Sequence, residues 1–456
     1  MMQKLFSAGV LFFVAISAFA GGLLTNTNQS VHFLRDPARD ASTEIDATYT
    51  NPAGLTFLAD GFQFSLTNQS AFQTRTITST FAPFAADNGG DPTKVFKGTA
   101  EALVIPSFQL AYKKDRWVFS SAFAITGGGG KATFNQGLPS FEAPIAMIPA
   151  QLSASGIPTT AYSSNESMQG RQFIFGLQMN ASYKISNVFS GALGLRVNMV
   201  NDHYEGSVTD IQINPQFPLL NPTGGMISAT NFFTNLGQTA LAQSTANKYL
   251  NSTQSGWGIT PIIGLNYHWN GLNIGAKYEF MTSLTVHNNT SVDNTGMFPN
   301  GVNTPYDIPA LLTLGAEYKL CDKWKVSGGY HHFFDSDAKM ANNKQQYING
   351  GINEYLFGSE YSISEVFLVS AGTQITRTGV TDNYQSDMNF SLNSYSIGFG
   401  GTVKLTPKLR LNLAYFFTNY SKWTNASSNY NGTGLAGTDV YDRTNKVIGV
   451  GVDYKF

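Results

Sequence analysis

The last nine residues alternate between apolar side chains and small or charged ones. The apolar positions are Ile448, Val450, Val452, Tyr454 and Phe456. A period of two is typical of a β-strand whose two faces meet different surroundings. The pattern recurs at 189–197, 272–280, 308–318 and 409–418. Stretches of roughly ten such residues are long enough to cross a bilayer as tilted strands, so the pattern indicates strands with one face toward lipid.

The composition points in the same direction. Charged residues make up 12% of the chain, whereas about 25% is usual in soluble domains, and there are 5 Trp, 21 Tyr and 34 Phe. A disordered chain needs high charge and few aromatic residues, and a nucleic-acid-binding protein normally has a basic excess. The net charge here is −1, so the sequence favours neither class. The single Cys321 can form no internal disulfide, and the sequence assigns it no role.

The first twenty residues predict a secretory signal peptide. Lys4 precedes an apolar stretch from Leu5 to Ile16, and Ala18-Phe19-Ala20 gives a cleavage site near Ala20. No run of 18 apolar residues follows Gly21, so we expect no transmembrane helix.

Turn lengths separate a membrane barrel from a soluble β-sandwich, which would also alternate. Six short polar turns lie at 113–116, 184–187, 268–271, 320–323, 363–365 and 405–408. Long polar loops lie between them, as in barrels with tight periplasmic turns and long external loops. Two strands for each short turn, with one opening and one closing strand, predict a 14-stranded antiparallel transmembrane β-barrel over 60–456.

Two regions lack the strand pattern. Residues 21–59 carry several charges without alternation, and we expect this segment to fill the lumen as a plug. Residues 215–255 predict a long external loop, within which 229–250 has roughly helical apolar spacing. We interpret that stretch as a short pair of amphipathic helices, although a disordered loop would also fit. Phe232, Phe233 and Leu236 are the predicted capture residues of this loop.

These features together resemble a known family. The plug-length segment contains Asn51-Pro52-Ala53-Gly54-Leu55, fourteen predicted strands follow, and Phe456 ends the chain. This combination resembles the long-chain fatty acid transporter family of the FadL/TodX type. The final Tyr-Lys-Phe also looks like the signal that the barrel assembly machinery reads in outer-membrane proteins. The resemblance implies a plugged barrel in the cell outer membrane, surrounded by lipid and lipopolysaccharide.

The resemblance also implies a route for hydrophobic compounds: an external groove, an apolar pocket and a lateral opening at a kink in the third strand. In this sequence that strand begins at Trp117 and runs into Gly127, Gly128, Gly129 and Gly130. Glycines tolerate unusual backbone angles and can interrupt strand pairing. We predict that they form a lateral gate; the start of a flexible loop is the alternative.

Strand parity predicts an apolar ring in the upper lumen. Its members are Phe333, Phe416, Met281 and Leu311, each about nine residues above a short turn. Such a ring suits an alkyl chain, but it would equally suit packing against the plug. Arg196 has lumen parity and is the candidate cation for a fatty carboxylate, unless it pairs with a plug carboxylate such as Asp46 or Glu44.

The sequence thus favours an outer-membrane transporter for passive uptake of hydrophobic compounds, most plausibly long-chain fatty acids. An aromatic hydrocarbon or another lipid is an open alternative as substrate. A general diffusion porin and a surface adhesin or receptor are the alternative functions. None of the six histidines forms a metal-binding spacing, and no G-x-S-x-G motif is present. We therefore expect no catalytic residues, metal, cofactor or nucleic-acid partner.

Overall fold

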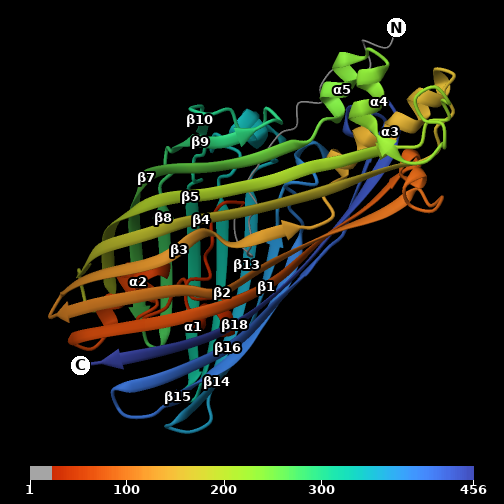
Figure 1. Ribbon diagram of the computed structural model, residues 1–456. Coiled ribbons are helices and arrows are strands. Elements are labelled where there is room, and N and C mark those ends of the chain that lie inside the picture. Colours follow the sequence, from red (N-terminus) through yellow and green to blue (C-terminus); the bar gives the residue numbers. More distant parts are fainter. Residues whose placement is uncertain (1–22) are drawn as a thin grey trace.

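The computed structural model describes residues 23–456 and shows one closed antiparallel sheet (Figure 1). The sheet closes because β1 pairs with β18 along its full length. The wall strands are β1 (Gly61–Phe81), β2 (Thr93–Lys114), β3 (Trp117–Phe134), β4 (Tyr162–Lys184), β5 (Phe189–Ile213), β7 (Lys248–Trp269), β8 (Leu272–Glu279) with β9 (Thr285–Asp293), β10 (Asn303–Pro305) with β11 (Leu311–Cys321), β12 (Trp324–Phe333), β13 (Ile352–Ser362), β14 (Phe367–Arg377), β15 (Ser394–Lys404), β16 (Leu409–Tyr420) with β17 (Trp423–Ser427), and β18 (Gly437–Lys455).

These segments make fourteen transmembrane strands, as predicted. β8 and β9 both pair with β7, and β16 and β17 both pair with β18, so each pair of segments is one interrupted strand. β10 and β11 are likewise joined, while the short β6 (Ile227–Ser228) only extends the end of β5. Each predicted short turn connects two neighbouring strands, at the end of the barrel where the chain also ends (Figure 1).

The outer face of the wall is apolar. Leu193 on β5 and Trp257 on β7 are 68% and 67% exposed, which suits a surface that faces lipid rather than water. Trp117, Trp269 and Trp324 are also exposed and lie beside short turns, where aromatic residues form the interfacial girdle. Within residues 23–456, none of the helices combines the length and the apolar character needed to cross a bilayer.

The N-terminal segment before β1 lies inside the lumen. It contains α1 (Val31–Arg35), α2 (Ala47–Thr50) and the 3-10 helix η2 (Pro52–Phe57), and nearly all of its residues up to Thr56 are buried. α1 contacts β14, β15, β16 and β18, while η2 contacts β4, β5 and β7, so the segment touches the wall on several sides. This arrangement is compatible with the predicted plug. The predicted domain boundary at residue 59 stays a prediction, and the signal peptide lies outside the described residues.

Glycines on the lumen face let the backbone of this segment approach the wall closely. A Cβ atom at Gly275 would overlap the carbonyl oxygen of Asp40, and one at Gly398 would overlap that of Leu34. At Gly358 the space is taken by the carboxylate of Asp36. Any larger residue at these positions would displace the segment, because protein interiors are close-packed.

Ion pairs add specific links between the segment and the wall. Arg35 on α1 pairs with Glu360 of β13 at 2.5 Å, and His32 lies 3.1 Å from Asp453 of β18. A third link involves His331 of β12, whose Nε2 lies 2.9 Å from Asp40 Oδ1 and whose Nδ1 lies 3.0 Å from Glu354 Oε2. The lumen charges near the segment are therefore largely paired with one another.

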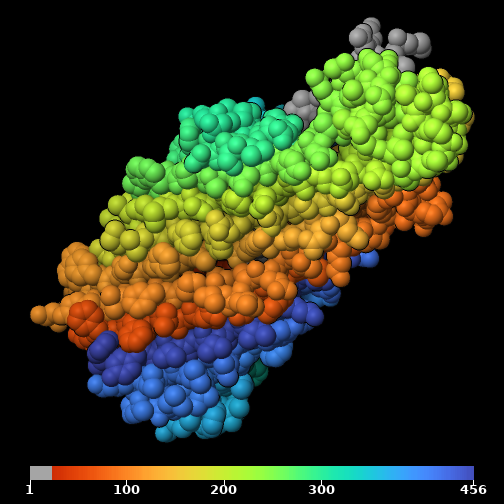
Figure 2. Space-filling model, viewed as in Figure 1, coloured from red at the N-terminus to blue at the C-terminus, as the bar shows by residue number. Residues whose placement is uncertain are grey.

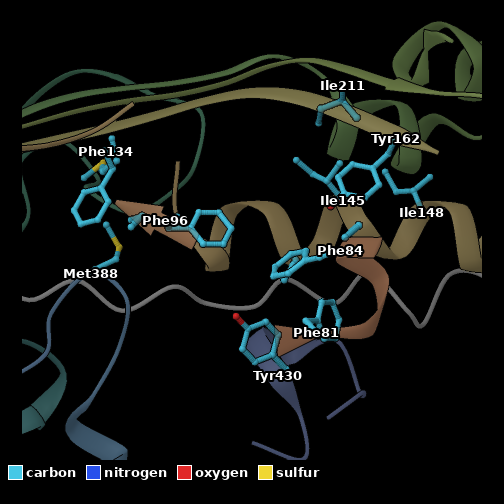
Figure 3. Close-up of a cluster of buried hydrophobic side chains, with 14 of the residues drawn as sticks. Phe81, Phe84, Phe96, Phe134, Ile145, Ile148, Tyr162, Ile211, Met388 and Tyr430 are labelled. Atoms are coloured by element: carbon cyan, nitrogen blue, oxygen red, sulfur yellow. The ribbon is translucent and has the colours of Figure 1, made fainter. Parts of the chain in front are cut away.

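Loops and helices form a second core at the other end of the barrel. Figure 2 shows this mass standing beyond the end of the wall. It contains α3 (Pro139–Ala154), α4 (Ala229–Asn235), α5 (Thr239–Thr245) and four 3-10 helices, η3 (Ala82–Ala86), η4 (Ala341–Tyr347), η5 (Asp382–Tyr384) and η6 (Tyr430–Gly432). α4 and α5 confirm the predicted helix pair, whereas α3 was not predicted. Its buried side chains pack with those of η3 and β5 (Figure 3).

The glycine contacts lead to a first prediction. Gly275→Ala should push the N-terminal segment away from β8 and destabilise the folded protein by about 1–3 kcal/mol, because the overlapping atom is backbone and cannot rotate away. Gly328→Ala is the matched control, since the nearest atom to its Cβ would be 3.9 Å away. Thermal unfolding of the two variants and of the unaltered protein tests this, and equal stability of the two variants would contradict it.

Candidate functional site

A cavity of about 320 Å³ opens among the external loops. It lies between α3, the far end of β5, α5 and the start of β7, and much of its lining is apolar, including Ile145, Ile148 and Ile211. Figure 3 shows these three side chains grouped beside Tyr162. The N-terminus of α3 is held by a distant loop, because the Ser140 backbone N–H donates to the Asp387 carboxylate at 2.7 Å. We call this space the surface cavity.

A second cavity of about 290 Å³ lies above the start of the N-terminal segment. Leu23 and Leu24 line it together with Val286 of β9 and Phe298. We call this second space the lumen cavity. Met297 lines both the lumen cavity and the surface cavity, so the two cavities are neighbours. Both have the size and the mixed apolar lining of small-molecule sites.

Polar groups in the lumen cavity are mostly satisfied by one another. Gln254 donates to Asn288 at 2.8 Å, and the Tyr306 hydroxyl donates to Asp202 at 3.0 Å. Buried polar groups that are already paired impose little cost on an apolar ligand. Within residues 23–456, no group of three or more metal-ligating side chains is placed to hold a metal ion.

The barrel wall is interrupted between β2 and β3. The regular pairing of these strands stops at Glu101 and resumes at Phe108. Opposite this gap, β3 has two irregularities in its pairing with β4, between Ile125 and Gly127 and between Gly128 and Gly130. Gly128 and Gly129 have φ of 65° and 114°, which side chains with a Cβ rarely adopt. The glycine run therefore lies at a break in the pairing of the wall strands. Its role as a lateral gate stays a prediction.

The N-terminal segment lies directly behind this break. Asn26 donates its backbone N–H to the Thr126 carbonyl at 2.8 Å and its side-chain amide to the Gly128 carbonyl at 2.9 Å. Gln29 donates to the Ile125 carbonyl at 2.9 Å. A Cβ at Gly127 would overlap the Leu24 carbonyl, and Leu24 also lines the lumen cavity. The break in the wall and the lumen cavity thus share a boundary.

The Asn51-Pro52-Ala53-Gly54 motif fixes the other end of the segment to the wall. The Asn51 amide donates to the Leu265 carbonyl at 3.0 Å, and Asn51 precedes η2, which has Pro at its first position. The carbonyls of Pro52 and Ala53 accept hydrogen bonds from wall serines, each at 2.8 Å. A Cβ at Gly54 would overlap the Ser42 carbonyl, so the motif fits only a small residue there.

The four residues of the predicted apolar ring do not come together. Phe333 and Leu311 face each other on β12 and β11 and pack with Leu23, whereas Phe416 packs with Phe33 of α1. Met281 is 42% exposed and lies outside both clusters. β8 ends at Glu279, and the residues before β9 shift the alternation, so the buried positions change from odd to even numbers. The three buried members therefore pack against the N-terminal segment, and the placement of Met281 is corrected.

Arg196 is also placed differently from the expectation. Its guanidinium forms two hydrogen bonds with Glu279 of β8, at 2.6 and 2.8 Å, and lies over the ring of Tyr49. Glu44 and Asp46 pair with Arg39 instead. Arg196 is therefore occupied by a wall carboxylate that a sequence pattern cannot identify.

The predicted capture residues are not at the surface. Phe232 and Phe233 of α4 are 1% and 2% exposed and belong to the second hydrophobic core, which the external loops and helices form. Leu236 is half-buried against that core. The surface cavity is lined instead by α3, whose apolar residues recur with helical spacing in a stretch that also contains Pro144 and Pro149. Two prolines obscure a helix in a sequence, although the spacing of Phe141, Ile145 and Ile148 could have revealed it.

Comparison with known proteins agrees with this architecture. No protein-family model and no curated protein sequence matches the chain. Among solved structures, a FadL homologue of Pseudomonas aeruginosa is similar with a TM-score of 0.64 at 12% identity, over 96% of this chain and 100% of that one. The toluene transporter TodX of Pseudomonas putida gives a TM-score of 0.54 at 16% identity, over 91% and 95% of the two chains. The toluene transporter TbuX of Ralstonia pickettii gives 0.54 at 14% identity, over 95% and 97%.

The chain has the FadL/TodX fold. At these identities the likeness is one of architecture, and it includes the closed barrel of fourteen strands.

The buried pair of Arg196 and Glu279 gives a second prediction. Glu279→Gln should destabilise the protein by about 3–5 kcal/mol, because it leaves Arg196 and the adjacent Lys277 without their shared carboxylate. Glu205→Gln is the control, since that carboxylate is about half exposed. The measurement is thermal unfolding in detergent. An equal loss of stability in both variants would show that the buried Arg196–Glu279 pair contributes no more to stability than an exposed carboxylate does.

Proposed function

We propose that the protein is an outer-membrane channel for the passive uptake of hydrophobic compounds, with long-chain fatty acids as substrates. The main support is that three features adjoin one another. The surface cavity and the lumen cavity share Met297, and the lumen cavity borders the break in the wall beside Gly127. In this proposal, residues 21–59 act as a plug after the signal peptide is cleaved near Ala20. FadL and toluene-transporter structures share the architecture, which supports the proposal.

The chemistry of the route favours apolar cargo. The two cavities expose apolar side chains to a ligand, and burial of a hydrocarbon chain is favourable without any directional contact. The described residues of the N-terminal segment are nearly all buried inside the lumen, so they occupy space that a water-filled channel for hydrophilic solutes would need. A break in the wall instead opens toward lipid, where a hydrophobic compound is soluble. The gradient of the compound supplies the driving force.

Met297 provides a direct test because it lines both cavities. Met297→Lys should reduce uptake of labelled long-chain fatty acid at least tenfold, because a charge in an apolar passage is poorly solvated. Leu219→Lys is the control, since Leu219 is 82% exposed on an external loop. Uptake is measured in cells that lack their own fatty acid channel, with a labelled sugar as a second solute. Sugar entry through the unaltered protein, or normal fatty acid uptake by Met297→Lys, would contradict the proposal.

Chain length gives an independent prediction. Each additional buried CH₂ group contributes about 0.8 kcal/mol, so affinity should rise about fourfold per methylene until the cavity is full. Titration of the purified protein with fatty acids of increasing length measures this. Affinity that is independent of chain length would show that the apolar part of the ligand is not bound.

A further inference from the structure

Three basic side chains stand next to one another on the outer face of the wall, on the neighbouring strands β3, β4 and β5 (Figure 1). Arg171 of β4 is paired in register with Lys131 of β3 on one side and with His203 of β5 on the other. The row ends at Glu101 of β2 and at Thr253 of β7. Like charges directly opposite each other repel, so the pairing of Lys131 with Arg171 is unfavourable unless an anion joins it.

The protein itself supplies little of the missing negative charge. Lys131 and Arg171 are exposed, and within the described part of the chain neither forms an ion pair. Arg171 donates to the side-chain oxygen of Asn201 at 3.1 Å, which uses only one of the five N–H donors of a guanidinium. The Nε2 atom of His203, which is charged only when protonated, lies 3.8 Å from Glu205. Donors and positive charge therefore remain available for an anion from outside the protein.

The row lies just beyond the apolar band of the wall. On the outer face of β4, every second residue from Phe173 to Tyr183 has an apolar or aromatic side chain, and Arg171 is the first charged residue above this run. Twelve residues separate Arg171 from Tyr183, which lies beside a short turn. At about 3.3 Å per residue and a tilt of about 40°, the height is roughly 30 Å. Because the apolar band of such barrels is about 25 Å tall, the row lies among the head groups of the external leaflet.

Aromatic side chains connect the row to the apolar wall below it. The Arg171 guanidinium lies 5.9 Å from the centre of the Phe173 ring, and the rings of Phe173 and Phe175 are stacked with their centres 5.6 Å apart. Lys131 directly follows Gly130, so the row also adjoins the break between β2 and β3. A lipid with its head group at the row would lay its acyl chains along this aromatic surface, beside the break.

We propose that Lys131, Arg171 and His203 bind the phosphate groups of lipopolysaccharide, the phosphorylated glycolipid of the external leaflet. Guanidinium and ammonium groups bind phosphate oxygens through charge-assisted hydrogen bonds. The three side chains extend over two strand spacings, about 10 Å, which suits a head group with more than one phosphate better than a lipid with a single phosphate. The inference goes beyond the proposed function, because it concerns the lipid-facing side of the wall and requires no transported compound.

Binding of matched lipids to the purified full-length protein in a neutral detergent tests this site. The probes are lipid A with two phosphates, lipid A with one phosphate, and phosphatidylglycerol, and native mass spectrometry measures the bound fraction of each. The unaltered protein should bind lipid A with two phosphates at least tenfold more tightly than phosphatidylglycerol. Removal of one phosphate should weaken the binding of lipid A. If either of the other lipids bound as tightly as lipid A with two phosphates, the assignment would be overturned.

Variants of the basic residues locate the effect. Arg171→Gln should bind lipid A with two phosphates at least fivefold more weakly, and the double variant Lys131→Gln/Arg171→Gln more weakly still. Arg171→Lys should keep part of the affinity, since it retains the charge but not the paired donors. Lys446→Gln is the matched control, because Lys446 is exposed on the outer face of β18 but has Phe72 and Phe417 as its in-register neighbours. An equal loss in Arg171→Gln and Lys446→Gln, or no loss in the double variant, would overturn the proposal.

Thermal unfolding separates a lipid site from a structural role. Without lipid, the double variant should unfold at the same temperature as the unaltered protein, because both substituted side chains are exposed. Lipid A with two phosphates should raise the unfolding temperature of the unaltered protein and of Lys446→Gln, but not that of the double variant. An equal rise in the double variant would show that the lipid binds elsewhere.

The outcomes also distinguish this inference from the proposed function. If lipid A fails to bind while labelled fatty acid still enters the cells, only the glycolipid site is wrong. If lipid A binds as expected while fatty acid uptake is absent, the proposed function is wrong and the glycolipid site stands.

Discussion

The structure depends on how an irregular polypeptide is accommodated inside a closed barrel. The N-terminal segment brings carbonyl groups into a space from which most water is excluded, and each needs a hydrogen-bond partner. Wall side chains supply several of them: Ser182 and Ser190 donate to the carbonyls of Pro52 and Ala53, and Asn180 donates to that of Thr48. The lumen face of the wall therefore carries polar side chains or glycines where it meets the backbone of the segment, and apolar side chains such as Phe416 where it meets apolar residues of α1.

The same requirement explains how the wall can be interrupted. In a membrane, backbone groups without partners cost several kcal/mol each, so a strand cannot simply separate from its neighbour. Here Asn26 and Gln29 bind carbonyls of β3 where its regular pairing fails. The segment thus replaces part of the missing strand contacts from inside the barrel.

Sequence alone predicted the features that have local signals. Alternation and turn residues act over a few neighbours, so the fourteen strands, their short turns and the helices α4 and α5 could all be found. The prediction that Met281 faces the lumen was wrong because the strand is interrupted after Glu279, which shifts the alternation of buried and exposed residues. The residue types at this point do not indicate the interruption. The partner of Arg196 lies 83 residues away on another strand, and a pattern along the chain cannot show such a pairing. The two cavities could not be predicted from the sequence for the same reason, because residues from several separate loops line each of them.

The distribution of buried charge gives the lumen two kinds of surface. Around the N-terminal segment, arginines and carboxylates neutralise one another, and pairs such as Arg35 with Glu360 of β13 link the segment to the wall. Toward the external end, Arg75 faces Arg443 across the sheet, beside Tyr384, which lines the lumen cavity. Among the described residues, the Arg75 guanidinium has no hydrogen-bond partner, so the charge pairing that holds the N-terminal segment does not extend to this position.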